Sequence, residues 1–344
     1  GALSTKATPI GDGKYKINGV KIFITSGESD LYDNNVHLVL ARTPDSKEGI
    51  QGISLFVIPR FSINEDGSVG DSNDVICHKI EHKMGLHASA TCELTFGEND
   101  NCIGELIGKE GDGIQNMFFM MNEVRLMCGM QSQSQGCLAY ELTRQYTKER
   151  VQFGTEIANL PDVRTTLLKM RSITRSMRSI TLYIAYLIDL FEKEKKSEIE
   201  DEISLLTPVC KAWCTDEGFQ ISVDAVQMHG GYGYCSEYGI EQFVRDTKIA
   251  TIYEGTNGIQ SIDLVTRKIL KDKGHSIGLF LTKVKADLKA SSLTSHSETI
   301  NHQVEKLEKV LEYFSQQQDI NIVLQHTTQF LQMFGNLVAS WRLF

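Results

Sequence analysis

The chain has 344 residues, of which 41% are hydrophobic and 23% are charged, and this composition is typical of folded globular domains. Its 35 basic and 44 acidic residues give a net charge of −9, which excludes an overall positive field that would hold nucleic acid or an anionic membrane. The longest apolar stretch, near Tyr183 to Leu190, is interrupted by Asp189, so we expect no membrane span.

The first part of the chain, from residue 1 to about Cys102, consists of short β-type runs between turn residues. Asn18-Gly19 separates two of these runs, and this dipeptide predicts a tight hairpin turn at that point. Further strands are expected at 36–40, 53–58 and 91–96. Together the runs predict a compact β domain over residues 1–105, either a barrel or a sandwich.

After residues 111–113, turn residues become rare and apolar residues recur at helical spacing. Helices are expected at 117–150, 163–194 and 207–228, and a fourth is expected from residue 259. Pro161 marks the entry to the second of them. The charge-rich stretch 193–202 is interpreted as a solvated connection between helices.

Long helices with few breakers predict an all-α four-helix bundle over residues 106–271, so the chain is expected to be an α+β multidomain protein. Residues 272–344 contain further amphipathic stretches and predict an additional helical extension, which we expect to be incomplete. The eight cysteines are scattered, without a CxxC pair, which favours a reducing compartment. Cys210 and Cys214 could share a metal, but buried packing thiols are the simpler interpretation, and we predict no metal site.

Two segments near the end of the expected bundle carry groups that suit chemistry. The glycines in residues 227–234 let backbone approach a ligand, although a plain turn between helices would look the same. Glu254 lies between Tyr253 and Gly255 at the start of a helix, in an apolar setting that suits a carboxylate base. A helix-start carboxylate stabilised by the helix dipole is the alternative interpretation.

Six motifs then occur in one order along the chain. They are Lys21-Ile-Phe-Ile-Thr-Ser-Gly27, Lys83-Met-Gly-Leu-His-Ala-Ser89, Asn122-Glu-Val-Arg125, Arg150-Val-Gln-Phe-Gly154, Gln227-Met-His-Gly-Gly231 and Tyr253-Glu-Gly-Thr256. This set closely resembles the acyl-CoA dehydrogenase family over residues 1 to about 271. The resemblance implies a middle β domain followed by a helical bundle, with FAD between them. Asn257-Gly258 and the long segment after Lys271 resemble the subgroup with an extra C-terminal helical domain.

The resemblance implies the oxidation of an acyl-CoA thioester to a trans-2-enoyl-CoA, as in fatty-acid β-oxidation. Glu254 stands at the position of the family's catalytic glutamate and would remove the α-proton while the β-hydrogen leaves as hydride to flavin N5. The thioester carbonyl would bind the backbone N–H of Glu254 and a flavin ribityl hydroxyl, which stabilises developing enolate charge. In a minority of the family the base precedes the residue matched by Arg125. Here that residue is Val124, and the adjacent Glu123 should point elsewhere.

The same resemblance implies the remaining site residues. FAD would be held by Phe23, Thr25, Arg150, Gln152, Phe153, Gln227, Gly230, Gly231 and Thr256. The acyl-CoA would be held by Ser89, Asn122, Arg125, Tyr253 and Gly255. The chain departs from the family pattern at several positions, with Phe23 for Trp, Gln152 for Thr, Asn122 for Asp and Gly258 for Gln. Two chains together would complete each FAD site, so a homodimer or homotetramer is expected.

The expected partner is an electron-transferring flavoprotein, which would accept the electrons. An acyl-CoA oxidase has the same base and flavin but passes electrons to O₂, and sequence alone hardly separates the two. A non-catalytic binding or assembly member, including the DNA-associated branch, is disfavoured by the retained Glu254 and the acidic net charge. A bacterial cytoplasm and a mitochondrial matrix both fit. Relatives carry an N-terminal helical domain before the point matched by residues 1–6, so this domain is expected to be missing here.

Overall fold

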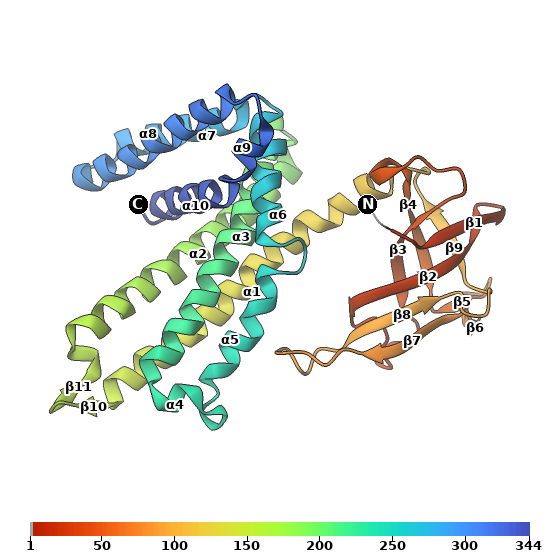
Figure 1. Cartoon of the computed structure of the whole chain (residues 1–344), viewed down its shortest axis with the longest axis horizontal. Coiled ribbons are helices and arrows are strands. Elements are labelled where there is room, and N and C mark those ends of the chain that lie inside the picture. The colour runs from red at the N-terminus through yellow and green to blue at the C-terminus, as the bar shows by residue number, and fades with distance from the viewer. Residues whose placement is uncertain (1–2) are drawn as a thin grey trace. The chain divides into compact units, whose positions relative to one another are not determined.

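The computed structural model describes residues 3–344, except for the side chain of Phe119. The chain divides into two compact units, Gly1–Met121 and Asn122–Phe344, and helix α1 (Gly113–Glu149) contributes residues to both. Strands dominate the first unit and helices the second, which confirms the predicted order of a β region followed by an all-helical region (Figure 1). The predicted domain boundaries at 105/106 and 271/272 stay predictions, and residues 1 and 2 lie outside the described residues.

The first unit is built on one seven-stranded sheet with the order β1-β3-β4-β9-β2-β8-β7, in which β1 also pairs with β2. Its strands are β1 (Lys6–Gly11), β2 (Lys14–Thr25), β3 (Val36–Arg42), β4 (Ile53–Pro59), β7 (Val75–Ile80), β8 (Thr91–Phe96) and β9 (Ile103–Ile107). A separate pair consists of β5 (Phe61–Ile63) and β6 (Val69–Ser72). Apolar side chains from the large sheet, among them Ile17, Phe56, Leu94 and Phe96, form the core of this unit.

The predicted hairpin at Asn18-Gly19 is wrong, because β2 runs through it without a break. The tight turn is instead Asp12-Gly13, where both residues have positive φ (51° and 72°) and β1 folds back onto β2. Gly19 serves a close approach, since a Cβ there would lie 2.8 Å from the Thr5 hydroxyl. Near this point β2 exchanges its pairing with β9 for pairing with β8.

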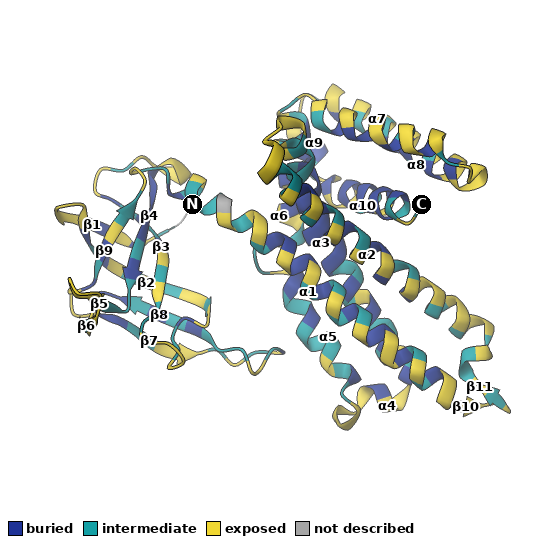
Figure 2. Ribbon diagram, turned by 180° about the vertical axis from the view of Figure 1, so that it is seen from behind, coloured by how far each residue is buried: buried dark blue, intermediate teal, exposed yellow. Residues whose placement is uncertain are grey.

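The second unit consists of long helices that pack around one apolar core. Its main helices are α1, α2 (Pro161–Glu194), α3 (Ser197–His229), α5 (Ile240–Lys248), α6 (Asn257–Ile262), α7 (His275–Ala290), α8 (Thr294–Gln316) and α10 (Thr327–Leu343). Shorter elements are β10 (Val151–Gln152), β11 (Thr155–Glu156), α4 (Gly231–Tyr234) and α9 (Ile320–Leu324). Buried residues follow one face of α2 and α8, as amphipathic periodicity requires, whereas the middle of α3, Leu205–Thr215, is buried on all sides (Figure 2).

Two local features of the helical unit differ from the sequence interpretation. The charged stretch 193–202 is mostly helical, because α3 already begins at Ser197. Glu198 and Glu200 lie in the first turn of α3, where carboxylates are favoured by the helix dipole, and Ile199 packs against the core. The predicted helix from residue 259 begins as α6 and continues as a π-helical segment, Asp263–Leu270.

The C-terminal helices α7, α8 and α10 share the core of the bundle. Phe334 and Leu337 of α10 belong to the same buried cluster as Trp213 of α3 and Ile180 of α2. A Cβ added at Gly335 would come within 2.4 Å of the Trp213 ring, so α10 and α3 are in close contact. Among the helices in the described residues, none is long and apolar enough to cross a membrane.

Candidate active site

The turn that carries Glu254 is a strained connection between the short helical segment Ile249–Thr251 and helix α6. Glu254 and Gly255 have φ values of 55° and 88°, so two consecutive residues adopt a conformation that is unfavourable for a residue with a side chain. Thr256 then caps α6, because its hydroxyl accepts a hydrogen bond from Ile259 N at 3.3 Å. In the sequence Glu-Gly-Thr, Glu254 therefore lies in the turn, Gly255 adopts a positive φ without steric cost, and Thr256 caps the following helix.

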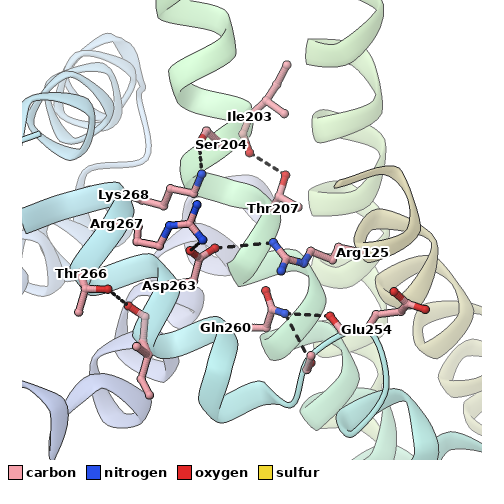
Figure 3. A network of polar contacts seen from close by, with 12 residues as sticks. Arg125, Ile203, Ser204, Thr207, Glu254, Gln260, Asp263, Thr266, Arg267 and Lys268 are labelled. Atoms are coloured by element: carbon pink, nitrogen blue, oxygen red, sulfur yellow. Dashed lines mark hydrogen bonds and ion pairs between the residues drawn. The ribbon is translucent and has the colours of Figure 1, made fainter. Parts of the chain in front are cut away.

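The carbonyl groups of this turn are held from the interior of the unit. Gln260 Nε2 donates to Glu254 O at 3.2 Å and to Gly255 O at 3.4 Å. Lys211 Nζ, from α3, donates to Gly255 O at 2.7 Å and to Asn257 Oδ1 at 2.8 Å. In Figure 3 the Glu254 carboxylate lies on the opposite side of its own backbone from Gln260. The backbone is thus held from one side while the carboxylate is directed to the other.

A buried polar network surrounds the Lys211 ammonium. Asn257 Nδ2 donates to Asp216 Oδ1 at 2.7 Å and to Thr215 Oγ1 at 3.0 Å, so the Asn257 side chain ties α6 to α3. Lys211 is fully buried, and desolvation lowers its pKa to about 8. Desolvation likewise raises the pKa of the Asp216 carboxyl. The network costs desolvation energy and fixes the geometry of the turn.

The Tyr253 side chain forms a hydrogen bond with helix α1. Its hydroxyl donates a hydrogen bond to Gln131 Oε1, and burial raises its pKa. Burial also raises the pKa of the neighbouring Cys128 thiol to about 11, so this cysteine is protonated at neutral pH. The side chain of Tyr253 therefore packs against α1, and any role of this residue in substrate binding stays a prediction.

Arg125 of α1 is only 5% exposed and pairs with Asp263, which is 7% exposed, at 3.6 Å. Arg267 approaches the other oxygen of Asp263 at 3.3 Å (Figure 3). Burial lowers the pKa of the Arg125 guanidinium, while Asp263 and Glu254 oppose this shift. Asn122, on the same helix, is exposed. The two residues predicted to contact acyl-CoA on α1 thus lie in different environments.

A second site lies at the other end of the long helices, in a cavity of about 590 Å³. Its lining includes Arg150, Gln152, Gln227, Gly230 and Gly231, which were predicted from two distant motifs. The Arg150 guanidinium lies 5.4 Å from the centre of the Tyr232 ring, which also lines the cavity. The structure therefore brings together these predicted FAD residues within one chain.

This cavity has an open glycine-lined wall. A Cβ added at Gly230 or Gly231 would meet nothing within 4 Å, so a ligand can approach the backbone there. Gly230 has a φ of 59° and ends α3. The neighbouring wall includes the Tyr146 and His229 rings, which stack with centroids 4.2 Å apart. An arginine fork beside glycine backbone that a ligand can approach suits a diphosphate.

The remaining predicted cofactor residues lie outside this cavity. Phe153 has a φ of 53° and a side chain that is 91% exposed. The Thr256 hydroxyl is already engaged in capping α6. Phe23 and Thr25 belong to β2 of the first unit, where Phe23 has a φ of 60° and is 69% exposed.

Ser89, the predicted CoA contact of the first unit, lies in a loop that is fixed by Lys83. Lys83 Nζ donates to Ser89 O at 2.5 Å and to Thr91 Oγ1 at 2.8 Å. Ser89 N donates to Leu86 O at 3.0 Å. The hydroxyl of Ser89 makes no hydrogen bond within the described residues, so it can serve a ligand.

Sequence reasoning missed Lys211, Gln260 and Asp263. Lys211 had a detectable signal, because a single lysine lies in the apolar stretch Val209–Cys214 in the middle of a predicted helix. A lysine in such a position is buried only with a specific partner. Gln260 and Asp263 had no such signal, since both follow a helix start with ordinary polar spacing.

Comparison with known proteins gives one consistent result. The family described as "Acyl-CoA dehydrogenase, C-terminal domain" matches residues 111–270. Butyryl-CoA dehydrogenase from Syntrophomonas wolfei is 42% identical, over 83% of this chain and 50% of that protein. The chain therefore spans about half the length of this curated relative.

Solved structures extend the likeness to nearly the whole chain. Caenorhabditis elegans ACDH-11, solved in complex with C11-CoA, is 26% identical with a TM-score of 0.84, over 98% of this chain and 57% of that one. An acyl-CoA dehydrogenase from Bacillus anthracis, complexed with FAD, has a TM-score of 0.78 over 98% of this chain and 58% of that one. The latter is 22% identical, so it supports the fold alone.

Proposed function

This chain belongs to the acyl-CoA dehydrogenase family, and we propose that it carries the catalytic base of an FAD-dependent enzyme that converts an acyl-CoA thioester to the trans-2-enoyl-CoA. The observation that supports this most directly is the turn at Glu254. Its carboxylate is presented from a backbone held by Gln260 and Lys211, and the backbone N–H of Glu254 has no partner among the described residues. A base and a hydrogen-bond donor therefore come from one residue.

In the proposed reaction, Glu254 accepts the α-proton of the acyl group and becomes a neutral carboxylic acid. The N–H of Glu254 donates a hydrogen bond to the thioester carbonyl and stabilises the enolate charge that develops as the proton leaves. When bound, FAD supplies the acceptor for the β-hydrogen, which departs with its electron pair. Loss of a proton from the α-carbon and a hydride from the β-carbon leaves the double bond of the product.

The residues around the 590 Å³ cavity fit the diphosphate of FAD. Arg150 would pair with the phosphates, and the open backbone of Gly230 and Gly231 would approach them. Gln152 and Gln227 supply polar side chains at the same wall. We extend the proposal to Phe23, Thr25, Phe153 and Thr256 as further cofactor contacts, and to Ser89, Asn122, Arg125, Tyr253 and Gly255 as acyl-CoA contacts.

We further propose an electron-transferring flavoprotein as the electron acceptor and a homodimer or homotetramer as the assembly. An oxidase is the competing function, because it differs only in passing electrons to O₂. Measuring hydrogen peroxide during turnover separates the two. A dehydrogenase is expected to form peroxide slowly relative to reduction of an added flavoprotein acceptor.

The proposed function is tested by adding saturated acyl-CoA to the FAD-loaded full-length protein without oxygen. The flavin absorbance should bleach, and trans-2-enoyl-CoA should form in amounts equal to the flavin reduced. A series of acyl chain lengths would also define the substrate. No bleaching with any acyl-CoA of the series would contradict the proposal.

A further inference from the structure

Lys211 and Gln260 converge on two successive carbonyl groups of the turn that carries Glu254. Gln260 Nε2 lies 3.2 Å from Glu254 O and 3.4 Å from Gly255 O, and Lys211 Nζ lies 2.7 Å from Gly255 O. Both side chains are fully buried. The two carbonyls are therefore held toward the interior by donors that come from α3 and α6.

The direction of these carbonyls determines the direction of the neighbouring N–H groups. The chain has no cis peptide bond among the described residues, and in a trans peptide the N–H points opposite to the carbonyl of the preceding residue. The N–H of Gly255 therefore points away from Gln260, and the N–H of Thr256 points away from Lys211. Neither N–H has a hydrogen-bond partner within the described part of the chain.

From this geometry we propose that Lys211 and Gln260 are positioning residues that aim the backbone N–H groups of Gly255 and Thr256, beside the N–H of Glu254, at the thioester carbonyl of the substrate. The inference rests on the proposed function and adds donors and their supports to it. Successive N–H groups in a left-handed turn form a concave site for an oxygen that gains negative charge. The N–H of Glu254 would then be one member of a preorganised group.

Burial of the polar groups of Lys211 and Gln260 costs desolvation free energy, which indicates that their hydrogen-bond donors are required at this place. Gln260 Oε1 is buried and makes no hydrogen bond, so the amide is kept for its Nε2 donor. The reverse orientation of the amide would place Oε1 against two carbonyl oxygens. A Cβ at Gly255 would lie 2.8 Å from Gln260 Nε2, so glycine leaves room for this contact.

The test uses Lys211→Met and Gln260→Met, which keep an unbranched side chain of similar length and remove the donors. Lys268→Met is the matched control, because Lys268 is a partly buried lysine of the same unit whose Nζ donates to Ser204 Oγ at 2.7 Å, away from the turn. The FAD-loaded full-length proteins are titrated with an acyl-CoA that carries sulfur in place of the β-carbon. This compound can lose its α-proton but cannot lose a β-hydride.

The long-wavelength absorbance that appears when the enolate lies against the flavin reports the acidity of the bound α-proton. We expect the apparent pKa of the bound ligand to rise by about one unit or more in Lys211→Met and Gln260→Met, and flavin reduction by substrate to slow about tenfold to a hundredfold. Lys268→Met should match the wild type in both measurements. FAD content and the helical circular dichroism show whether each variant is folded.

The outcomes separate the inference from the function on which it rests. If the wild type is reduced by acyl-CoA but the ligand pKa is unchanged in a folded Lys211→Met or Gln260→Met, the two residues have only a structural role and the inference is wrong. If Lys211→Met does not fold, Gln260→Met decides, because a neutral apolar side chain replaces a neutral amide there. If the wild type itself is not reduced, the proposed function fails first.

Discussion

Arg125 and Asp263 form an ion pair that is almost completely removed from solvent, with the charged atoms 3.6 Å apart. Arg125 belongs to α1 and Asp263 begins the π-helical segment, so the pair joins two elements that flank the Glu254 turn. π-helical segments often occur at functional sites. A substitution in this pair therefore measures how much a buried ion pair contributes to the stability of the structure around Glu254.

Replacing Asp263 by Asn should lower the free energy of unfolding of the helical unit by about 3–5 kcal/mol, because the buried Arg125 charge would lose the carboxylate that it pairs with. Urea denaturation followed by tryptophan fluorescence measures this unit selectively, since the chain's two tryptophans, Trp213 and Trp341, both lie in it. Glu192→Gln is the control, because it removes an exposed pair with Lys195 and should change stability by about 1 kcal/mol or less. Equal effects of the two substitutions would contradict the prediction.

Replacing Glu254 by Gln should leave FAD content unchanged and slow acyl-CoA-dependent flavin reduction by several orders of magnitude. The substitution keeps the shape of the side chain but removes the group that accepts the α-proton. Anaerobic stopped-flow absorbance measures the rate of reduction. Glu123→Gln, at an exposed position of α1, is the control and should reduce at the wild-type rate. A loss of reduction in Glu123→Gln, with normal reduction in Glu254→Gln, would assign the base to Glu123.

Replacing Arg150 by Ala should weaken FAD retention at least tenfold, because the proposed diphosphate site would lose its permanent cation. The FAD that remains after dialysis and the dissociation constant from fluorescence titration measure the effect. Arg164→Ala is the matched control, since Arg164 is exposed on α2 and lines a different cavity. Unchanged FAD affinity in Arg150→Ala would show that the 590 Å³ cavity does not hold the cofactor.

Much of the helical unit could be predicted from the sequence, because apolar periodicity over thirty residues leaves little choice. The position of Pro161 at the start of α2 followed from the same local chemistry. Asn18-Gly19 shows the limit of local reasoning. Its dipeptide signal indicated a hairpin, but β2 continues through Gly19, where Thr5, just before β1, approaches closely.

Only part of the candidate site could be predicted from the sequence. The Glu254 turn and the two FAD motifs came from family resemblance, and the structure brings Arg150 and Gly230 into one cavity. The contact between Lys211 and Gly255 could not be foreseen, because it joins positions that are 44 residues apart. Such contacts depend on how α3 and α6 pack, which no local pattern encodes.

The buried ammonium of Lys211 should make the stability of the helical unit depend on pH above about 8. The pKa of Lys211 is lowered to about 8 from 10.5. Between these values the unfolded chain binds more protons than the folded chain, so the free energy of unfolding should rise with pH. Below about pH 8 both states are charged, and the cost of burying the ammonium is fully present.

The measurement compares the wild type with Lys211→Met by urea denaturation at pH 7.5 and pH 10. The difference in unfolding free energy, wild type minus variant, should increase by up to about 3 kcal/mol between the two pH values. The titratable groups that face Lys211, namely Cys128 and Arg125 on α1, Asp216 on α3 and Glu254 in the turn, are present in both proteins and largely cancel. A difference that is independent of pH would show that Lys211 titrates normally.

The last prediction concerns the packing of the C-terminal helices on the bundle. Replacing Gly335 by Ala should destabilise the helical unit by about 1–3 kcal/mol, because the new methyl would lie 2.4 Å from the Trp213 ring. Trp213 cannot move freely, since it is buried and its Nε1 donates to Asn336 Oδ1 at 2.9 Å. Gly278→Ala is the control at an exposed position of α7, where a Cβ would meet nothing within 4 Å, and it should be neutral or stabilising by up to about 1 kcal/mol. If α10 and α3 unfold together, Gly335→Ala lowers the urea midpoint of the whole tryptophan signal. If Gly335→Ala instead splits that signal into two transitions, residues 272–344 unfold as a domain of their own, as the predicted boundary at 271/272 requires.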